Sequence, residues 1–265
     1  MRIVKMAVGI GNGAAVYVPK EYSGREVVVL LPEGVEQMKN RVLGALIQFL
    51  DNIVGIYLFG SYARQEEGKS SDVDVLIITK EKDVRIKNAI GDGDIRVMTL
   101  DSVKRAIREQ PLLIVPILRE AKTIINPVLL EELKAIEIDF KKFKWNFDDI
   151  RRIIKIIEGF IKLDDEDISI SHVYSLILRI RVCYLIECLL KNKKFSNEGT
   201  KELLLTHGFG RKEIDNYFDV YRRVRDDEEP KDKIKKEDIL KIINFLKIYS
   251  EKVENETKKK IGKRH

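Results

Sequence analysis

The sequence predicts an α+β fold in three segments: a small β module over residues 1–34, a mixed-sheet core with flanking helices over 35–127, and a helical bundle over 128–256. Three observations predict it. Short β-branched runs between glycine-rich turns fill the first segment, and a helix pattern with four strand patterns fills the second. Beyond Pro127 the strand patterns stop. A basic tail follows over 257–265.

The composition is that of a globular protein with enough apolar residues for a core, with 44% hydrophobic and 35% charged residues among 265. Abundant Ile, Lys and Glu with few Met and Cys are typical of thermophilic proteins. The net charge is +6, but the tail alone holds five lysines and arginines and no acid, so the rest of the chain is nearly neutral. Charge therefore predicts no nucleic-acid surface outside the tail.

The two cysteines, Cys183 and Cys188, lie in an apolar helical pattern. We expect buried thiols in a reducing compartment, because no second Cys or His pair completes a metal site. No segment approaches the roughly 18 apolar residues of a membrane span, and strand-like sequence begins at Met1, where a signal peptide would need a basic and then an apolar region. A cytoplasmic protein without membrane contact is predicted.

Residues 1–34 predict short strands joined by glycine-rich turns. Gly9, Gly11 and Gly13 do not predict a dinucleotide-binding loop, because that loop must lead into a helix and strand-like sequence ending at Pro19 follows instead. A β unit this small buries little surface alone. We therefore expect it to dimerise or to pack on the rest of the chain.

The stretch GNGAAVYVPKEYSGREVVVLL resembles the swapped-hairpin β module of the AbrB/MazE type, with its glycine turn, an apolar strand ending in Pro-Lys-Glu and a Val-rich strand. The resemblance implies a homodimer and DNA binding through residues 1–34. The charged residues of the module include Arg2, Lys5, Lys20 and Arg25, with Glu21 and Glu26. Because so few are basic, a structural or dimerising role is the alternative to DNA binding.

The core elements follow in order. Apolar residues spaced for one helix face predict a helix from Gly34 to Asp51: Val35, Met38, Val42, Ala45, Leu46 and Phe49. Strands are predicted at IVGIYLFG (53–60), VDVLIITK (73–80), GDGDIRVMTL (91–100) and AKTIIN (121–126), and a helix at SVKRAI (102–107).

The second half of the chain shows four helical patterns, at 130–162, 168–193, 198–222 and 234–254. The order of core and helical bundle resembles that of prokaryotic proteins with a HEPN domain, so a HEPN-like domain is one interpretation. HEPN ribonucleases carry an Arg four to six residues before a His. Neither His172 nor His207 has such an Arg, so the sequence does not predict a ribonuclease.

Asp72 and Asp74 stand two residues apart at the start of the second core strand. Strand side chains alternate, so both carboxylates are expected on one face. Two neighbouring carboxylates need a proton or a cation to compensate their charge. Oxygen ligands without His or Cys favour Mg²⁺, which binds one or two carboxylates together with substrate phosphates and water.

Gly60 and Ser61 follow the first core strand and begin a short helical stretch. A glycine permits close backbone approach, and the Ser hydroxyl and helix N-terminal amides can bind phosphate oxygens. Arg64, one turn later, adds a cation toward the same anion. The two strand ends together predict a site for a metal-bound nucleoside triphosphate, which is ATP or another NTP because no determinant of base specificity is visible.

The motif GSYARQEEGKSSDVDVLI resembles the signature of the DNA polymerase β-like nucleotidyltransferases: Gly-Ser, a variable span, then Ser/Thr-Asp-x-Asp before apolar residues. Small prokaryotic and antibiotic-modifying nucleotidyltransferases share it. The resemblance places Ser71 with Gly60, Ser61 and Arg64 on the nucleotide. It also implies a third carboxylate on a later strand. Asp94 is preferred, because it lies in register with its strand, and Asp92 is the alternative.

The resemblance further implies transfer of a nucleoside monophosphate to a hydroxyl, with pyrophosphate as the leaving group and two Mg²⁺ ions held by Asp72, Asp74 and Asp94. The acceptor is left open among a protein, an RNA and a small molecule. The alternative function is a DNA-binding regulator or antitoxin-type protein, whose core modifies or contacts a partner protein.

Overall fold

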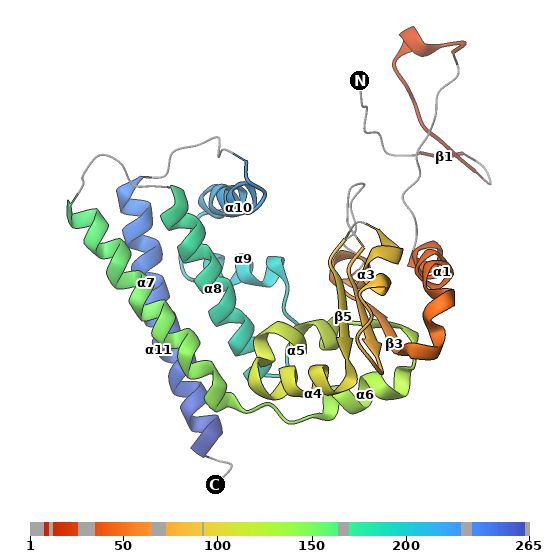
Figure 1. Ribbon diagram of the computed structural model, residues 1–265. Coiled ribbons are helices and arrows are strands. Elements are labelled where there is room, and N and C mark those ends of the chain that lie inside the picture. The colour runs from red at the N-terminus through yellow and green to blue at the C-terminus, as the bar shows by residue number, and fades with distance from the viewer. Residues whose placement is uncertain are drawn as a thin grey trace.

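The computed structural model describes residues 8–10, 13–25, 35–64, 73–91, 93–163, 170–228 and 235–262. It confirms the predicted α+β class, with a mixed four-stranded sheet, flanking helices and a helical second half (Figure 1).

The central sheet contains the four strands that the sequence predicts. They are β3 (Ile53–Leu58), β4 (Val75–Thr79), β5 (Ile95–Thr99) and β6 (Lys122–Ile125), in the spatial order β5-β4-β3-β6. β3 runs antiparallel to both β4 and β6, whereas β4 and β5 are parallel. The C-terminal end of β3 therefore meets the N-terminal ends of the other three strands at one edge of the sheet. We call this edge the catalytic edge, after the candidate catalytic residues Asp74 and Asp94 that the sequence predicts there.

The sheet is buried on both faces, which explains why its strands are continuous apolar runs. On one face, Tyr57, Leu76 and Ile78 join a core with residues of α4 (Leu100–Glu109) and α5 (Pro111–Glu120). On the other, Ile56, Leu58 and Ile77 pack with residues of α1 (Val35–Leu46) and α3 (Arg85–Ile90). The predicted first helix loses α-helical geometry early, because Ile47–Asn52 form a 3-10 helix.

The helical half has more breaks than its pattern predicts. The segment expected as one helix over 130–162 is α6 (Pro127–Ala135), a 3-10 turn (Phe140–Phe143) and α7 (Lys144–Leu163). The chain is extended at Ile136, and the Asp139 side chain caps the following turn. The segment expected over 198–222 is α9 (Asn197–Thr206) and α10 (Arg211–Arg225). The helix α6 packs against α5, β3 and β6, so it lies on the sheet.

Helix α8 (Ile170–Leu190) is the centre of the helical half. It packs against α7, α10 and α11 (Lys236–Gly262), and its cysteines, Cys183 and Cys188, are buried free thiols as predicted. One hydrophobic core runs from the sheet face under α5 into this bundle. The HEPN-like interpretation of the bundle stays a prediction. Within the described part of the chain, no helix has the length and apolar content needed to cross a membrane.

The last helix extends farther than its pattern predicts. α11 ends at Gly262, so most of the segment expected as a basic tail continues the helix. Thr257 is buried there, and its hydroxyl donates to the carbonyl oxygen of Val253. Ile261 packs against the main core. Lys258, Lys259 and Lys260 therefore project from a helix that is anchored to the bundle.

In the N-terminal segment, β1 (Val8–Ile10) and β2 (Gly13–Ala15) form an antiparallel hairpin, followed by a 3-10 turn at Lys20–Tyr22. The hairpin stands apart from the central sheet (Figure 1). The third predicted strand of the β module lies outside the described residues, so the AbrB-like arrangement stays a prediction.

Candidate functional site

The catalytic edge brings together residues that are distant in the sequence. The Phe59 N–H donates to the carbonyl oxygen of Asp74 at 2.9 Å, and the Val75 N–H donates to that of Asp94 at 3.1 Å. These backbone hydrogen bonds join the end of β3 to the start of β4, and the start of β4 to the start of β5. Gly60, Asp74 and Asp94 therefore lie side by side on three neighbouring strand ends.

Asp74 and Asp94 lie on the same face of the sheet. In the parallel pair of β4 and β5, Val75 is opposite Ile95 and Leu76 is opposite Arg96. The two aspartates each precede this register by one residue, so their side chains point to the same side. That side carries α4 and α5. The two aspartates thus lie on the side and at the edge where the sequence predicts Mg²⁺ ligands, and their binding of a shared cation stays a prediction.

Gly60 is packed directly against the Asp74 carboxylate. It begins α2 (Gly60–Arg64) with φ of 69°, in the left-handed region that favours glycine. A Cβ atom at this position would lie 1.7 Å from Oδ2 of Asp74. The absence of a side chain at Gly60 is therefore what lets the Asp74 carboxylate occupy its position.

Asp94 pairs with Arg96, a cation to which the sequence motif does not point. Nη2 of Arg96 lies 2.8 Å from Oδ2 of Asp94, and both side chains are partly exposed, at 39% and 45%. The Arg96 guanidinium also lies over the Phe59 ring, 5.5 Å from its centroid. This pair compensates the charge of Asp94 and keeps its carboxylate at the catalytic edge.

Glu120, the last residue of α5, is a second residue to which the motif does not point. Its Oε1 accepts a hydrogen bond from the Gly60 N–H at 2.8 Å. The phosphate contact predicted for the Gly60 amide would have to compete with this carboxylate. A signal was present in the sequence, because Glu120 directly precedes the predicted strand at 121–126. Carboxylates at the starts of strands that run in one direction meet at one edge of a sheet.

The remaining predicted site residues are not placed by the structure. Ser71, Asp72 and Asp92 lie outside the described residues, and only the backbone of Ser61 and Arg64 is described, within α2. Within the described ranges, no group of three His, Cys, Asp or Glu side chains could hold a metal ion. Asp74 and Asp94 nevertheless fit Mg²⁺, because this ion needs only one or two carboxylates when substrate phosphates supply other ligands.

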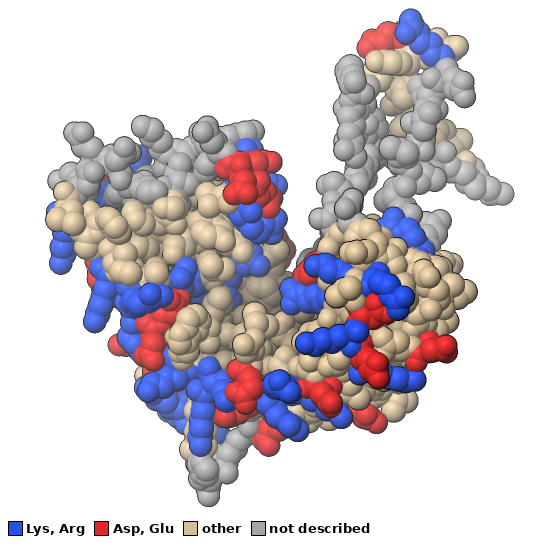
Figure 2. Space-filling view, viewed as in Figure 1, with Lys and Arg blue, Asp and Glu red and all other residues tan. Residues whose placement is uncertain are grey.

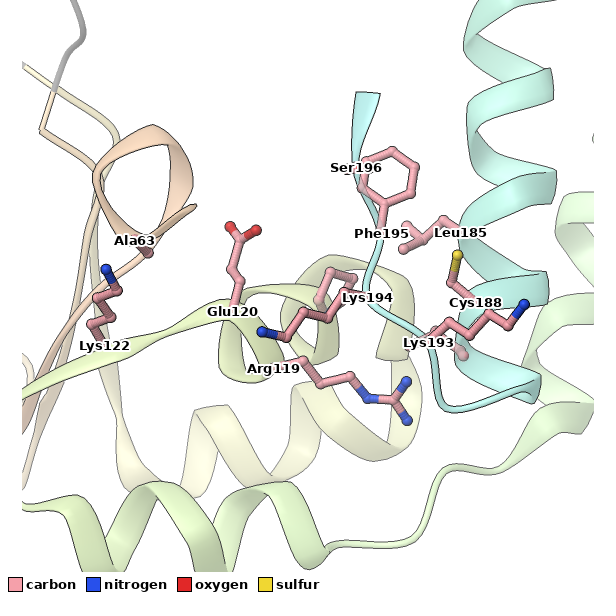
Figure 3. A pocket seen from close by; sticks show the side chains of 12 residues that line it. Ala63, Arg119, Glu120, Lys122, Leu185, Cys188, Lys193, Lys194, Phe195 and Ser196 are labelled. Atoms are coloured by element: carbon pink, nitrogen blue, oxygen red, sulfur yellow. The ribbon is translucent and has the colours of Figure 1, made fainter. Parts of the chain in front are cut away.

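A cavity of about 430 Å³ opens beside the catalytic edge, between α5 and the connection from α8 to α9. We call it the interface cavity (Figure 3). Its apolar lining residues are Ala63, Pro116, Leu185, Cys188, Leu189 and Phe195. Its polar lining residues are Arg119, Glu120, Lys122, Lys193, Lys194 and Ser196. Glu120 belongs to both the cavity and the catalytic edge, so a molecule in the cavity lies next to Gly60.

Sequence comparison finds a relative of this chain in MJ1305 of Methanocaldococcus jannaschii, which is provisionally named a protein adenylyltransferase. The two chains are 32% identical over 140 residues, a match that takes up 92% of that protein and 49% of this chain. A solved structure of spectinomycin adenyltransferase AAD(9) from Enterococcus faecialis, with ATP and spectinomycin, aligns with a TM-score of 0.45 and 15% identity, covering 83% of this chain and 100% of that chain.

The sequence model of the nucleotidyltransferase domain matches residues 39–203. The match begins in α1, includes the whole catalytic edge and extends through α8 into α9. It covers more than half of the chain. The protein therefore belongs to the nucleotidyltransferase domain family and is a nucleotidyltransferase.

Proposed function

We propose that this enzyme transfers AMP from ATP to a hydroxyl group of a protein, in a Mg²⁺-dependent reaction that releases pyrophosphate. The observation that carries the proposal is the meeting of Gly60, Asp74 and Asp94 at the catalytic edge, with the Asp74 carboxylate packed on the Gly60 backbone. The choice of ATP and of a protein acceptor rests on the name of the relative MJ1305.

The metal ligands in this proposal are Asp72 and Asp74, with Asp94 as the third carboxylate. When bound, Mg²⁺ would neutralise charge on the phosphate oxygens and favour ionisation of the attacking hydroxyl. Arg96, which pairs with Asp94 in the structure, would then share that carboxylate with the metal. Ser61, Arg64 and Ser71 are proposed to bind the phosphates.

The reaction is an in-line substitution at the α-phosphorus of ATP. The acceptor oxygen forms the new P–O bond, and the bond between the α-phosphorus and the bridging oxygen of the β-phosphate breaks. The electron pair of that bond leaves with pyrophosphate, and the hydroxyl proton passes to a carboxylate of the catalytic edge, with Asp94 as the proposed base. Positioning and charge stabilisation by the side chains at this edge account for the catalysis.

The test is labelling with ATP that carries a radioactive α-phosphate. The enzyme is incubated with this ATP, Mg²⁺ and a cell extract, and protein and RNA are then separated. We expect label on protein, resistant to ribonuclease, and no label when EDTA removes Mg²⁺. The double variant Asp72→Asn, Asp74→Asn should lose the labelling while its urea unfolding curve stays close to that of the wild type.

Each other outcome counts against a defined part of the proposal. Label on RNA would show that the acceptor is an RNA and not a protein, and the proposed transfer reaction would stand. Undiminished labelling by the double variant would exclude the catalytic edge as the site. Equal labelling from GTP labelled in the same position would remove the assignment of ATP as the preferred donor.

A further inference from the structure

The interface cavity carries an excess of positive charge. Four cationic residues, Arg119, Lys122, Lys193 and Lys194, line it with a single carboxylate, Glu120. Among the described residues, none of the four cations forms an ion pair with an acidic side chain. Figure 2 shows lysine and arginine side chains on both sides of the hollow between the sheet and the helical half.

Arg119 adds a partly buried cation to the wall of the cavity. Its Nη1 atom is buried and has no hydrogen-bond partner among the described residues. Burial lowers the pKa of the Arg119 guanidinium, although it remains charged at neutral pH. A buried charged donor without a partner is strongly unfavourable. An anion bound nearby in the cavity would offset this positive charge.

The cations lie on both walls of the cavity. Arg119 and Lys122 come from α5 and β6, on the sheet side, and Lys193 and Lys194 come from the connection after α8. In Figure 3 the Lys194 side chain extends into the space toward Glu120, whereas the Lys193 side chain lies on the α8 side of the connection. A ligand held between Lys122 and Lys194 would therefore pass beside Glu120.

Apart from Ser196, the rest of the lining is apolar, which argues for a peptide rather than for inorganic phosphate groups alone. Pro116, Leu185 and Leu189 offer no hydrogen bonds from their side chains but can bury a hydrophobic residue. Phe195 is already in contact with Arg181, whose guanidinium lies 5.7 Å from the ring centroid, and with Tyr184. Its ring is thus a poor platform for stacking the bases of an RNA.

We infer that the cations of the interface cavity select the acceptor of the reaction, and that this acceptor is an acidic peptide segment carrying the hydroxyl to be modified. The inference rests on the proposed AMP transfer to protein. Glu120 links the cavity to Gly60, so an acidic segment held here presents its hydroxyl next to the catalytic edge. A polycationic acceptor would be repelled by the same side chains.

Two labelled pentapeptides test the inference by fluorescence anisotropy. Both have a central tyrosine, flanked on each side by two glutamates in one peptide and by two glutamines in the other. The wild type should bind the glutamate peptide more tightly. The double variant Lys122→Ala, Lys194→Ala should weaken binding of that peptide about tenfold, the effect of losing one charged hydrogen bond.

The matched control is Lys155→Ala, which removes an exposed lysine of α7 that does not line the cavity. It should leave peptide binding unchanged. The basic residues at the C-terminus are intact in every variant, so non-specific binding to them would persist in all of them. Binding of Mg²⁺ and a fluorescent ATP analogue is measured in parallel and should change by less than about twofold, because the donor occupies the catalytic edge.

The inference would be overturned if the wild type bound the two peptides equally well. It would also be overturned if the double variant lost binding of the ATP analogue and kept binding of the glutamate peptide, since the cavity would then hold the phosphates of the donor. If an RNA oligonucleotide displaced the labelled glutamate peptide at a lower concentration than the unlabelled peptide does, the inferred acceptor would be an RNA and not a peptide. If the wild type bound the glutamate peptide but not the ATP analogue, the proposed function would be contradicted, whereas the preference of the cavity for an acidic peptide would be supported.

Discussion

Gly60 is the residue at which the catalytic edge tolerates the least change. The Gly60→Ala variant would place a Cβ atom against Oδ2 of Asp74 and hold a non-glycine residue at positive φ. We expect labelling from ATP to fall on the order of 100-fold, because the displaced carboxylate can no longer bind its ligand. The free energy of unfolding should fall by about 1–3 kcal/mol, measured by urea denaturation.

Gly159→Ala is the matched control for this substitution. Gly159 lies within α7, and a Cβ atom there would have no tertiary neighbour within 4 Å. Alanine should leave labelling unchanged and raise the stability by about 0.5–1 kcal/mol, since alanine is the better helix former. If both variants kept full activity, the contact between Gly60 and Asp74 would have no catalytic role.

Asp94 and Asp92 can be distinguished as the third carboxylate by one pair of variants. Asp94→Asn should reduce labelling from ATP at least about 100-fold, because a metal ligand contributes several kcal/mol to transition-state stabilisation. Its stability should change by less than about 1 kcal/mol, since the pair with Arg96 is partly exposed. Asp92→Asn should retain most of the activity. The opposite result would assign the role to Asp92.

At the scale of elements, the sequence predicts the four core strands and their residues well. Each is a run of β-branched and aromatic residues bounded by turn residues, and each run contains a strand in the structure. The order and direction of the strands could not be predicted, because they depend on pairings such as that of Ile56 with Ile125 across a long sequence separation. The position of Asp94 beside Asp74 follows from that pairing pattern and not from the motif.

The sequence pattern does not predict helix α5, and the reason is physical. The helix sequence, PLLIVPILRE, contains two prolines and almost no polar residue until its end, so it lacks the alternation of apolar and polar residues that marks an amphipathic helix. The helix is buried between the sheet and the bundle, where Ile114, Val115, Ile117 and Leu118 all join the core. The role of Glu120 is equally hidden, because its contact with Gly60 joins residues 60 positions apart.

The contact between α8 and α11 contains a buried carboxylate, Glu187. It accepts hydrogen bonds from Lys191 and from Oη of Tyr249, the latter at 2.5 Å. Burial alone would raise the pKa of Glu187, but the hydrogen bonds from Lys191 and Tyr249 outweigh it, so the pKa lies below its ordinary value of 4.5. A lowered pKa means that this carboxylate stabilises the fold above pH 4.5 and that the stabilisation is lost as the pH falls through the folded-state value.

Tyr249→Phe should therefore lower the free energy of unfolding by about 1.5–3 kcal/mol at neutral pH, the value of a hydrogen bond to a charged group. The difference from the wild type should shrink as the pH falls below 4.5 and through the lowered folded-state pKa of Glu187, where this carboxylate becomes protonated. Urea unfolding at neutral and at acidic pH measures both effects. Tyr17→Phe, at an exposed tyrosine, is the control and should have no effect. A difference independent of pH would show that Glu187 is not involved.

At the scale of the whole molecule, the N-terminal module is separate from the catalytic edge. No described residue among 8–10 and 13–25 belongs to either hydrophobic core, and Val8 and Ile10 are 50% and 55% exposed. Removing residues 1–34 should leave labelling from ATP within about twofold of the full chain. Light scattering should show the loss of the homodimer that the AbrB-like resemblance implies, and a gel shift should show the loss of any DNA binding.

A truncated chain that folds but no longer labels protein would instead make the module part of the enzyme. A truncated chain that remains dimeric would place the dimer contact elsewhere. In both cases the prediction of an autonomous dimerisation module would be wrong, whereas the assignment of the catalytic edge would stand.

In the proposed reaction, helix α5 gives the two reactants a common support. Its apolar side chains are fixed between the sheet and the bundle, its Pro116 and Arg119 line the interface cavity, and its last residue contacts Gly60. In this proposal the distance between acceptor and donor is therefore set by the end of the helix, from Pro116 to Glu120. Inserting or deleting a residue in α5 would rotate the cavity wall by about 100° relative to the catalytic edge, so the enzyme can change its acceptor by substitutions in the cavity wall but not by changing the length of this helix.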